Sequence, residues 1–357
     1  MRPNSEYIFS KSSLKSRNRT FLAAMTNKQS HENGILSDAE INWLTRRAKD
    51  GFGVITTAAS HVSKHGKGWS GEMGVWDDSH IPGLTKMATQ LRENNSISLV
   101  QIFHGGMKAP SELNDRIPVC PSEMRDNEGK IIARELELFE IHDLINDFTN
   151  AALRCEKAGF DGIEIHGAHS YLISQFLGVK TNRRTDQYGG SVENRFRFLK
   201  EIIISIREVV SENFLISVRI SPKINTIGIS LEDSLEVTKM LTEMEIDMLH
   251  LSCWDVFDKS TSKTNLTKLF RPLIPQSIAY ISTGAIWTAS DARWLIEQGA
   301  DFVGVARVAI AHPDWARGVE LENYEPKRPP FTEKELLEAD LSQVFVDYMK
   351  NWKGFVQ

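Results

Sequence analysis

Eight short apolar runs recur along the chain and alternate with longer amphipathic segments. The runs lie near residues 20–25, 53–59, 97–103, 162–167, 214–221, 247–253, 279–285 and 302–310. Short runs rich in valine and isoleucine are typical of buried strands, and the amphipathic segments are typical of helices. Eight strands that alternate with helices predict an α/β fold, a parallel sheet closed into a (β/α)8 TIM barrel. The alternative is an open, doubly wound sheet, but no run is followed by GxGxxG, the usual dinucleotide fingerprint.

Helix boundaries are marked by glycines and by capping residues. The segments "RRAKDGFGVIT", "RCEKAGFDGIEI" and "LIEQGADFVGV" each lead from a helix through a glycine into a strand; these glycines are Gly51, Gly159 and Gly299. Glycine takes the left-handed conformation of a helix C-cap without strain. Ser230 with Asp233 predicts one helix start, and Ser290 before "DARWLIEQ" predicts another.

Two segments exceed the eight units of strand and helix. Residues 104–136 follow the third strand, and the turn at 127–129 between two β-capable runs predicts a hairpin that caps the barrel. The tail 320–357 contains Thr332 and Glu335 in a capping-box pattern, followed by apolar residues at helical spacing. This pattern predicts a helical tail, which either packs on the flank of the barrel or forms a subunit contact.

Composition and charge restrict the class of protein. The chain has 357 residues with 41% hydrophobic and 25% charged side chains, typical of soluble globular proteins, and we expect 1–357 to form one barrel domain. The formal net charge of −5 argues against a nucleic-acid partner, and no apolar run is long enough for a membrane span. The N-terminal residues lack the apolar core of a secretory signal, and the cysteines form no CxxC pair. We therefore expect a cytoplasmic protein without structural zinc or disulfides.

Catalytic groups of a TIM barrel come from the C-terminal ends of its strands and from the loops that follow. In this chain those positions hold Ala24, Met25, Thr26, Ala59, Gln101, His104, His166, His169, Tyr171, Arg219, Gly284, Ala306 and Arg307. Small residues at the ends of strands seven and eight are typical of a phosphate site, because they leave backbone N–H groups exposed. The planar, positively charged guanidinium of Arg307 adds paired N–H donors for such a phosphate. The simpler alternative is that Gly284 and Gly304 only permit close packing.

A guanidinium and two imidazoles are unusual at buried strand ends. Arg219 lies inside a β run, so it needs a partner, either Glu164 or an anionic ligand. His166 and His169 can be metal ligands, structural turn residues or two N–H donors for one carbonyl oxygen. A catalytic zinc needs at least three protein ligands, which the other strand ends do not offer. In the donor alternative Tyr171 supplies a proton, and a cofactor with a phosphate and a planar ring supplies the hydride or electrons.

Long motifs in a characteristic order fill the central part of the chain. The stretches "AGFDGIEIHGAHSYLISQFL" and "NRRTDQYGGSVENRFRFLKEII", together with "LVQIFHGG", "SVRIS", "STGAI" and "GVARVAI", resemble the signature of the old yellow enzyme family of flavin-dependent ene-reductases. The resemblance runs from about residue 5 to about residue 318. The N-terminal stretch "NRTFLAAMTNKQSHENGILSDAEINW" is most similar to the compact bacterial branch of NADPH dehydrogenases.

The resemblance implies a cofactor, a reaction and a set of site residues. It implies non-covalent FMN with contacts at Ala23, Ala24, Met25, Thr26, Ala59, Gln101, Arg219, Gly284, Ala306 and Arg307. It implies that His166 and His169 hold the carbonyl oxygen of the substrate, that Tyr171 donates the proton and that Lys28 belongs to the substrate site. The implied reaction is ping-pong reduction of a small-molecule activated alkene, an α,β-unsaturated carbonyl compound, with NADPH or NADH as reductant. Relatives also imply a homodimer or homotetramer.

Four positions depart from the pattern of the compact branch. Thr26 stands where cysteine is frequent, Lys28 where a tyrosine reaches the substrate, Ser170 where glycine is usual, and Met107 where an arginine is frequent. These departures bear on flavin tuning and on substrate preference. Two alternative functions stay open: an FMN-binding NAD(P)H:acceptor oxidoreductase without alkene reduction, and a metal-dependent barrel hydrolase that uses the two histidines.

Overall fold

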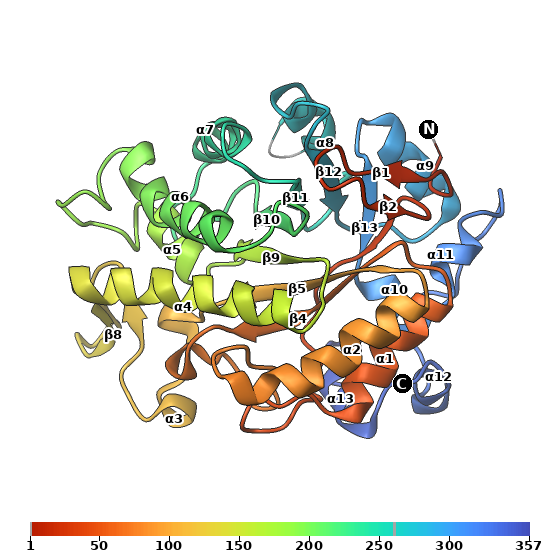
Figure 1. The fold of residues 1–357 in the computed structure, drawn as a ribbon, viewed down its shortest axis with the longest axis horizontal. Coiled ribbons are helices and arrows are strands. Elements are labelled where there is room, and N and C mark those ends of the chain that lie inside the picture. The colour runs from red at the N-terminus through yellow and green to blue at the C-terminus, as the bar shows by residue number, and fades with distance from the viewer. Residues whose placement is uncertain (1, 260–261) are drawn as a thin grey trace.

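Eight parallel strands form a closed barrel at the centre of the computed structural model, which describes residues 2–259 and 262–357. The strands follow one another around the barrel in chain order: β3 (Thr20–Leu22), β4 (Val54–His61), β5 (Ile97–Phe103), β9 (Gly162–Gly167), β10 (Leu215–Ile220), β11 (Met248–Ser252), β12 (Ala279–Thr283) and β13 (Phe302–Val305). Closure comes from the pairing of β13 with β3, in which Val303 lies opposite Thr20. The predicted (β/α)8 barrel is confirmed (Figure 1).

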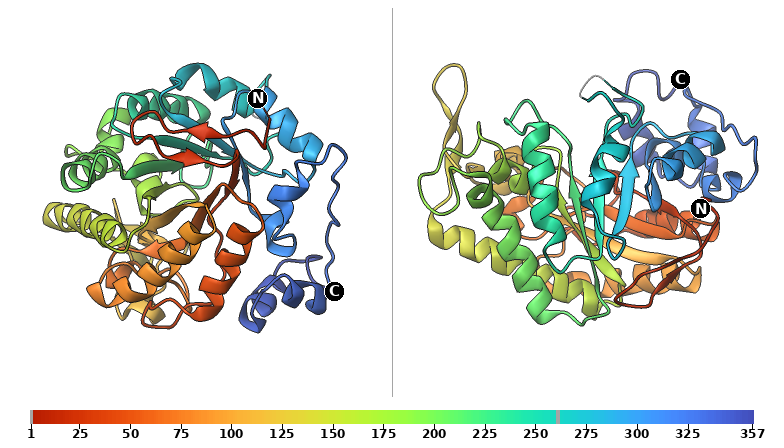
Figure 2. Two further views of the ribbon diagram at one scale, coloured as in Figure 1. Left: turned by 45° about the vertical axis from the view of Figure 1, so that its right-hand side comes forward. Right: turned by 90° about the horizontal axis from the view of Figure 1, so that it is seen from above.

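Helices surround the barrel and cover the outer faces of its strands (Figure 2). The longer helices are α1 (Asp38–Lys49), α2 (Ile81–Glu93), α4 (Leu138–Lys157), α6 (Val192–Val209), α7 (Leu231–Thr242) and α9 (Ala289–Glu297). The shorter ones are α3 (Ser111–Asn114), α5 (Leu172–Leu177), α8 (Leu266–Phe270), α10 (Arg307–Ala311), α11 (Trp315–Gly318), α12 (Glu333–Glu338) and α13 (Gln343–Met349). Of the helices in the described ranges, none is both long and apolar enough to cross a membrane.

Most predicted helix boundaries agree with the structure. The three predicted C-cap glycines have positive φ angles of 116°, 89° and 105° in chain order, in or beside the region that side chains with a Cβ avoid. Ser230 and Asp233 form the predicted capping box at the start of α7. The predicted start at Ser290 is wrong. The N-cap of α9 is Thr288, which forms a capping box with Asp291, so Ser290 already lies in the first turn.

The last apolar run divides between two elements. The segment predicted as one strand over 302–310 is a strand only as far as Val305, and α10 begins at Arg307. Ala306 between them has φ −126° and ψ −80°, which is not an extended conformation. Periodicity alone does not separate a short buried helix from a buried strand, because both are continuously apolar.

A small N-terminal hairpin closes one end of the barrel. Its strands are β1 (Tyr7–Ile8) and β2 (Lys15–Ser16), which pair antiparallel. Phe9, which follows β1, stacks on Phe302 at a ring-centroid distance of 5.8 Å and belongs to the apolar cluster inside the barrel. The N-terminal end of the barrel is thus filled by side chains, and the opposite end is left to form a site.

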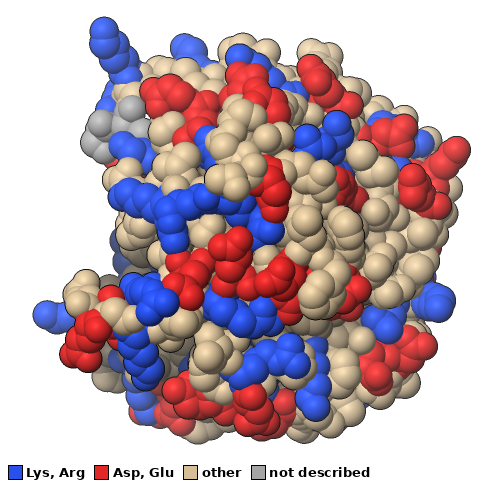
Figure 3. Space-filling view, turned by 90° about the vertical axis from the view of Figure 1, so that its left-hand side faces the viewer, with Lys and Arg blue, Asp and Glu red and all other residues tan. Residues whose placement is uncertain are grey.

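The segment 104–136, which we call the cap after its predicted role, contains three short strands. They are β6 (Val119–Cys120), β7 (Met124–Arg125) and β8 (Ile131–Glu135), in the spatial order β6-β8-β7. β7 and β8 form the predicted hairpin around 127–129, and β6 adds a parallel third strand. On this side of the molecule basic and acidic side chains intermix rather than gather by sign (Figure 3).

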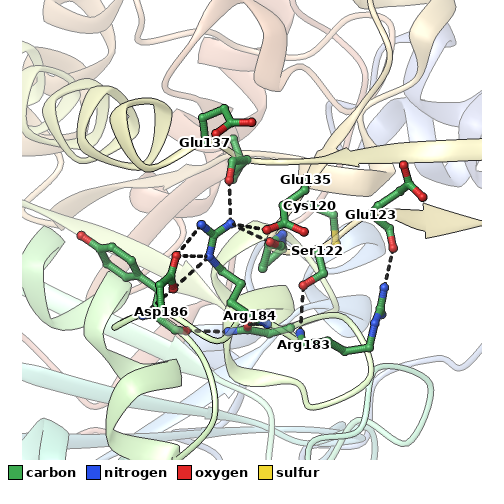
Figure 4. Close-up of polar contacts among 12 residues, drawn as sticks. Cys120, Ser122, Glu123, Glu135, Glu137, Arg183, Arg184 and Asp186 are labelled. Atoms are coloured by element: carbon green, nitrogen blue, oxygen red, sulfur yellow. Dashed lines mark hydrogen bonds and ion pairs between the residues drawn. The ribbon is translucent and has the colours of Figure 1, made fainter.

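Arg184 anchors this cap to the rest of the chain. Its guanidinium donates to the carbonyl oxygens of Pro121 and Leu136, at 2.9 and 2.6 Å. The same group forms ion pairs with Asp186 at 2.6 Å and with Glu135 at 3.3 Å (Figure 4). The motif "NRRTDQYGG" therefore holds the cap in place, because a buried guanidinium with both carbonyl and carboxylate partners is costly to pull apart.

The C-terminal tail packs on the flank of its own barrel. α12 starts with the predicted capping box of Thr332 and Glu335. Phe345 on α13 lies edge-on to Trp43 of α1, with ring centroids 5.3 Å apart, and both side chains are buried. This is the flank arrangement of the two that the sequence left open.

Candidate active site

Two adjoining cavities open at the C-terminal ends of the strands. Their volumes are about 280 and 60 Å³, and they share Met25, Thr26, His169 and Arg219 as lining residues. Twelve of the fourteen predicted site residues line one or both: Ala24, Met25, Thr26, Ala59, Gln101, His166, His169, Tyr171, Arg219, Gly284, Ala306 and Arg307. The other two lie beside the cavities. Ala23 is buried behind the wall and donates its N–H to the carbonyl of Val305 at 2.9 Å, and Lys28 lies against the ring of Tyr348.

The histidine pair and the tyrosine meet because the chain turns sharply after β9. His166 is the last residue but one of the strand, and His169 and Ser170 both have left-handed backbone conformations, with φ 59° and 63°. The imidazole rings lie 5.0 Å apart between centroids, and the ring of Tyr171 lies 5.0 Å from that of His166. Ser170 thus keeps the turn that glycine would adopt more easily, and Tyr171 stays beside the histidines.

Burial decides the protonation of these three side chains. It holds the pKa of both His166 and His169 well below the ordinary value, and the positive charge of Arg219 adds to the effect. Both imidazoles are therefore neutral near pH 7, and each has one N–H to donate. Burial raises the pKa of Tyr171 to about 12, so its hydroxyl keeps its proton. The group consists of neutral hydrogen-bond donors around one cavity.

Arg219 has an unsatisfied buried donor. One Nη donates to the carbonyl of Ala24 at 3.3 Å and the other to Oγ of Ser252 at 3.1 Å, but Nε is buried without a partner. Ser252 also contacts Nε2 of His169 at 2.8 Å, so it links the guanidinium to the histidine pair. A buried guanidinium N–H without an acceptor is costly, and an electron-rich ligand in the cavity would satisfy it.

Glu164 does not serve as the close partner of Arg219 that the sequence suggested. Its carboxylate accepts from Nδ1 of His250 at 2.7 Å and from the Gln101 amide at 2.7 Å. Because a carboxylate can only accept, the Gln101 side chain must present its NH₂ to Glu164 and keep its carbonyl oxygen free for another donor. Glu164 is thus a paired structural carboxylate that orients Gln101 in the cavity wall.

The far end of the larger cavity is built from small residues and one arginine. A Cβ on Gly284 would lie 2.7 Å from the carbonyl oxygen of Cys253, so a larger residue does not fit. Ala306 and Arg307 follow at the start of α10, and the Arg307 guanidinium lies 5.2 Å from the ring centre of Trp254. Gly304 also packs tightly, because its Cβ would overlap Oγ1 of Thr283. The close-packing role and an anion-binding role of these glycines are compatible.

Six aromatic residues of the cavity walls were not predicted from the sequence: Trp69, Trp254, Trp287, Tyr348, Trp352 and Phe355. Trp69, in the loop after β4, stacks on Phe103 at 5.3 Å and lines the smaller cavity. Tyr348 of α13 lines the larger cavity; burial raises its pKa, and side-chain hydrogen bonds with Trp352 and Thr26 partly oppose that shift. A tryptophan in the glycine-rich loop "KGWSG" was a usable signal for Trp69. Nothing local in the sequence placed the tail over the strand ends.

The comparisons with known proteins agree with this geometry. The model of the NADH:flavin oxidoreductase / NADH oxidase family matches residues 10–325. The chain belongs to this family. The probable NADH-dependent flavin oxidoreductase YqiG of Bacillus subtilis (strain 168) is 37% identical over 315 residues, which are 85% of this chain and 84% of that protein. The NADH oxidase of Thermoanaerobacter brockii is 34% identical, and the match covers 84% of this chain but only 48% of that longer protein.

Solved structures place the chain among the old yellow enzymes. The old yellow enzyme homologue from Zymomonas mobilis superposes with a TM-score of 0.81 at 25% identity, over 98% of this chain and 99% of the other. As a member of this flavin family, the chain is an FMN-dependent oxidoreductase with a nicotinamide as reductant. The residues present suit FMN: Arg219 has an orphaned donor, Gln101 has a free amide oxygen, and Gly284 lines the larger cavity without a side chain.

Proposed function

We propose that this oxidoreductase reduces the carbon–carbon double bond of α,β-unsaturated carbonyl compounds by a ping-pong scheme, with NADPH or NADH as reductant. The observation that supports this reaction is the group of three neutral hydrogen-bond donors, His166, His169 and Tyr171, beside one cavity. The two imidazole N–H groups can donate hydrogen bonds to an oxygen that gains negative charge, and the Tyr171 hydroxyl can donate a proton to a carbon.

The cofactor contacts in this proposal are those of the cavity wall. Ala24, Met25, Thr26, Ala59 and Gln101 would border the ring system, with Ala23 buried behind them. Arg219 would satisfy the electron-rich edge of the ring, and Gly284, Ala306 and Arg307 would hold the phosphate. FMN bound there would supply the hydride that adds to the β-carbon of the alkene. Since nicotinamide and alkene would both need to reach the same ring, they would use the cavity in turn.

The histidine pair would activate the alkene. His166 and His169 would each direct an N–H at the substrate carbonyl oxygen, which becomes more negative as the β-carbon accepts hydride. Neutral imidazoles suit this role, because burial keeps their pKa values low and the donors stay fixed by the turn at 169–170. Lys28, which lies against the ring of Tyr348 in the wall of the larger cavity, would contribute to substrate binding.

Tyr171 would finish the reaction. Its hydroxyl would give a proton to the α-carbon while the histidines still hold the oxygen. Burial raises its pKa to about 12, so the proton is present throughout the ordinary pH range. Phe103 lies edge-on at 5.0 Å and Trp69 at 6.3 Å, which fixes the ring beside His166.

The first prediction tests this division of roles. Replacement Tyr171→Phe should slow alkene reduction by about 10²- to 10⁴-fold, because general-acid catalysis contributes about that much. Flavin reduction by NADH should keep at least about half its rate. Stopped-flow absorbance measures the two half-reactions separately, with cyclohexenone as the acceptor. Tyr324→Phe, a tyrosine outside both cavity walls, is the matched control.

Two outcomes would contradict the proposal. Equal slowing of both half-reactions in the Tyr171→Phe variant would remove the tyrosine as proton donor. Steady NADH oxidation with dioxygen or a quinone, but none with any activated alkene, would leave a flavoprotein oxidoreductase without alkene reduction. Parallel lines in double-reciprocal plots for the two substrates are expected for the ping-pong scheme.

A further inference from the structure

Each of the two tyrosines in the cavity walls has a lysine ammonium on its ring. Nζ of Lys28 lies 5.1 Å from the ring centre of Tyr348, and Nζ of Lys108 lies 5.1 Å from that of Tyr171. Tyr348 lines the larger cavity and Tyr171 the smaller one, and the two cavities adjoin. We call Lys28 and Lys108 the rim lysines.

The rim lysines have no carboxylate partner in the described ranges 2–259 and 262–357. Lys67 and Lys86, by contrast, form ion pairs at 2.8 and 2.6 Å. No described Asp or Glu lines either cavity, whereas Arg219 and Arg307 do. The two arginines of the cavity walls and the two lysines over wall tyrosines therefore provide positive charge that no lining carboxylate neutralises, and such a site attracts anions.

Both rim lysines are positioned by the fold. Lys28 has a left-handed backbone conformation with φ 59°, and a Cβ on Gly71 would lie 2.3 Å from its carbonyl oxygen, so the loop after β4 packs tightly against it. Nζ of Lys108 donates to the carbonyl of His169 at 2.9 Å, beside the histidine pair. An ammonium has three donors, so Lys108 keeps two for a ligand.

We infer that the rim lysines select substrates with a carboxylate, in addition to the carbonyl group that activates the alkene. This inference rests on the proposed function and names its substrate class. The histidines would hold the activating carbonyl oxygen, and the carboxylate would reach the rim, where Lys28 and Lys108 lie over tyrosines that line the cavities. A charge-assisted hydrogen bond is stronger than a neutral one, so a bond to either rim lysine would favour the acid over its neutral ester.

Binding is tested first, because it does not require turnover. The probes are 4-hydroxybenzoate and its methyl ester, two phenols that differ in one charge, titrated into the FMN-loaded enzyme in a calorimeter. The carboxylate should bind more tightly than the ester by about tenfold, which is the ratio that one charged hydrogen bond provides. Lys28→Gln and Lys108→Gln should each reduce this preference, and the double variant should abolish it. Added salt should also reduce it.

The matched control is Lys157→Gln. Lys157 is exposed at the end of α4, which leads into the N-terminal end of β9, at the opposite end of the barrel from the cavities. The Lys157→Gln replacement removes the same charge from the protein and should leave the ratio of the affinities for acid and ester unchanged. Equal binding of acid and ester by the unmodified enzyme would overturn the inference, as would an unchanged ratio in the double variant.

Turnover supplies the second readout. The enzyme should reduce 4-oxopent-2-enoate with a higher kcat/KM than its methyl ester, although the ester group activates the double bond at least as well. The same lysine variants should lose this preference. If the enzyme reduces neither compound but still binds the carboxylate selectively, the proposed function is contradicted, whereas carboxylate selection by the rim lysines is not.

A third measurement separates the substrate carboxylate from the diphosphate of the nicotinamide. Stopped-flow reduction gives the apparent Kd for NADH in each variant. An increase in that Kd with an unchanged acid-to-ester ratio would assign the rim lysines to the dinucleotide and overturn the inference. The expected result is the converse, a changed ratio with an NADH Kd within about twofold of the unmodified enzyme.

Discussion

His169 and Ser170 show how much the site depends on two backbone conformations. Non-glycine residues in the left-handed region are uncommon, and each costs about 1 kcal/mol or more. Here two consecutive residues adopt it, and the result is that the rings of His166, His169 and Tyr171 gather beside one cavity. Strain of this kind persists where surrounding contacts hold it, such as the bond from the His169 N–H to Oγ of Ser221 at 3.3 Å.

The protonation of the same residues leads to a prediction about pH. Tyr171 has a raised pKa of about 12, so it loses its proton only far above neutrality, and the histidines have lowered pKa values, so they are uncharged well into the acid range. Single-turnover reoxidation of the reduced enzyme by cyclohexenone should therefore be independent of pH from about pH 7 to about pH 10. A limb near the ordinary histidine or tyrosine pKa in that profile would contradict the assigned protonation states.

Some of these residues could be predicted from the sequence because their signals are local. His166 and Arg219 each lie within or directly after a short β run, and the strand-end rule of a barrel assigns them to one site. Tyr348 had no such signal, because its contact with Thr26 joins the first barrel strand to the C-terminal tail. The partner of Glu164 also could not be predicted from the sequence, since His250 faces Glu164 only once the barrel has closed.

At the scale of elements, one arginine connects three helices. Arg47 of α1 is completely buried, and its guanidinium donates only to carbonyl oxygens. The acceptors are Trp43 on α1, Ala309 and Ile310 on α10 and Ala339 at the end of α12, at 2.8 to 3.1 Å. These bonds tie the tail to the part of the barrel that carries Arg307. The guanidinium also lies 4.2 Å from the ring centre of Trp43.

Replacement Arg47→Met should therefore loosen the tail as well as weaken the fold. It leaves buried carbonyl oxygens without donors, which we expect to lower the free energy of unfolding by about 2 to 4 kcal/mol. Urea denaturation measures that loss, and hydrogen exchange should show faster exchange in α12 and α13 than in β9. The adjacent Arg46→Met is the control, since the partly exposed Arg46 forms ion pairs with Asp50 and Asp340, and surface pairs contribute about 1 kcal/mol each at most. Uniform exchange across the chain in the Arg47 variant would argue against a tail-specific role.

The elements themselves were largely predictable, and the exceptions have physical causes. Seven of the eight apolar runs became strands close to their predicted bounds, because a buried parallel strand is continuously apolar. The eighth contains α10, which burial makes equally apolar, so pattern alone could not divide it at Ala306. The cap hairpin was visible from its turn, but the parallel strand β6 was not, since it pairs across a longer connection.

For the whole molecule, the closed barrel is filled by Phe9 and Phe302 at one end, and at the other end it leaves the two adjoining cavities where we propose that FMN binds. A ligand that binds only the folded state stabilises it in proportion to the logarithm of its concentration. Free FMN at about 100 times its Kd should therefore add about 2.7 kcal/mol to the free energy of unfolding.

Replacement Arg219→Met should reduce that gain. Arg219 offers FMN a buried donor with no other partner, so its loss should weaken FMN binding by about 10- to 100-fold. Thermal unfolding of apo-protein with increasing FMN measures the effect as a smaller rise in Tm at each concentration. Arg125→Met, on β7 of the cap, should titrate like the unmodified protein. An equal rise in Tm for the Arg219 variant would remove the guanidinium from the flavin site.

The wall of the larger cavity joins Met25 and Thr26 to Tyr348 and Phe355, which come from opposite ends of the sequence. Contacts between such distant segments form late in folding. On the ribosome, a nascent chain would expose the histidines and Arg219 for some time before the residue that encloses them is made. We expect flavin capture to follow the synthesis of the segment that contains Tyr348 and Phe355, so that translation products truncated before this segment neither retain the cofactor nor react with its substrates.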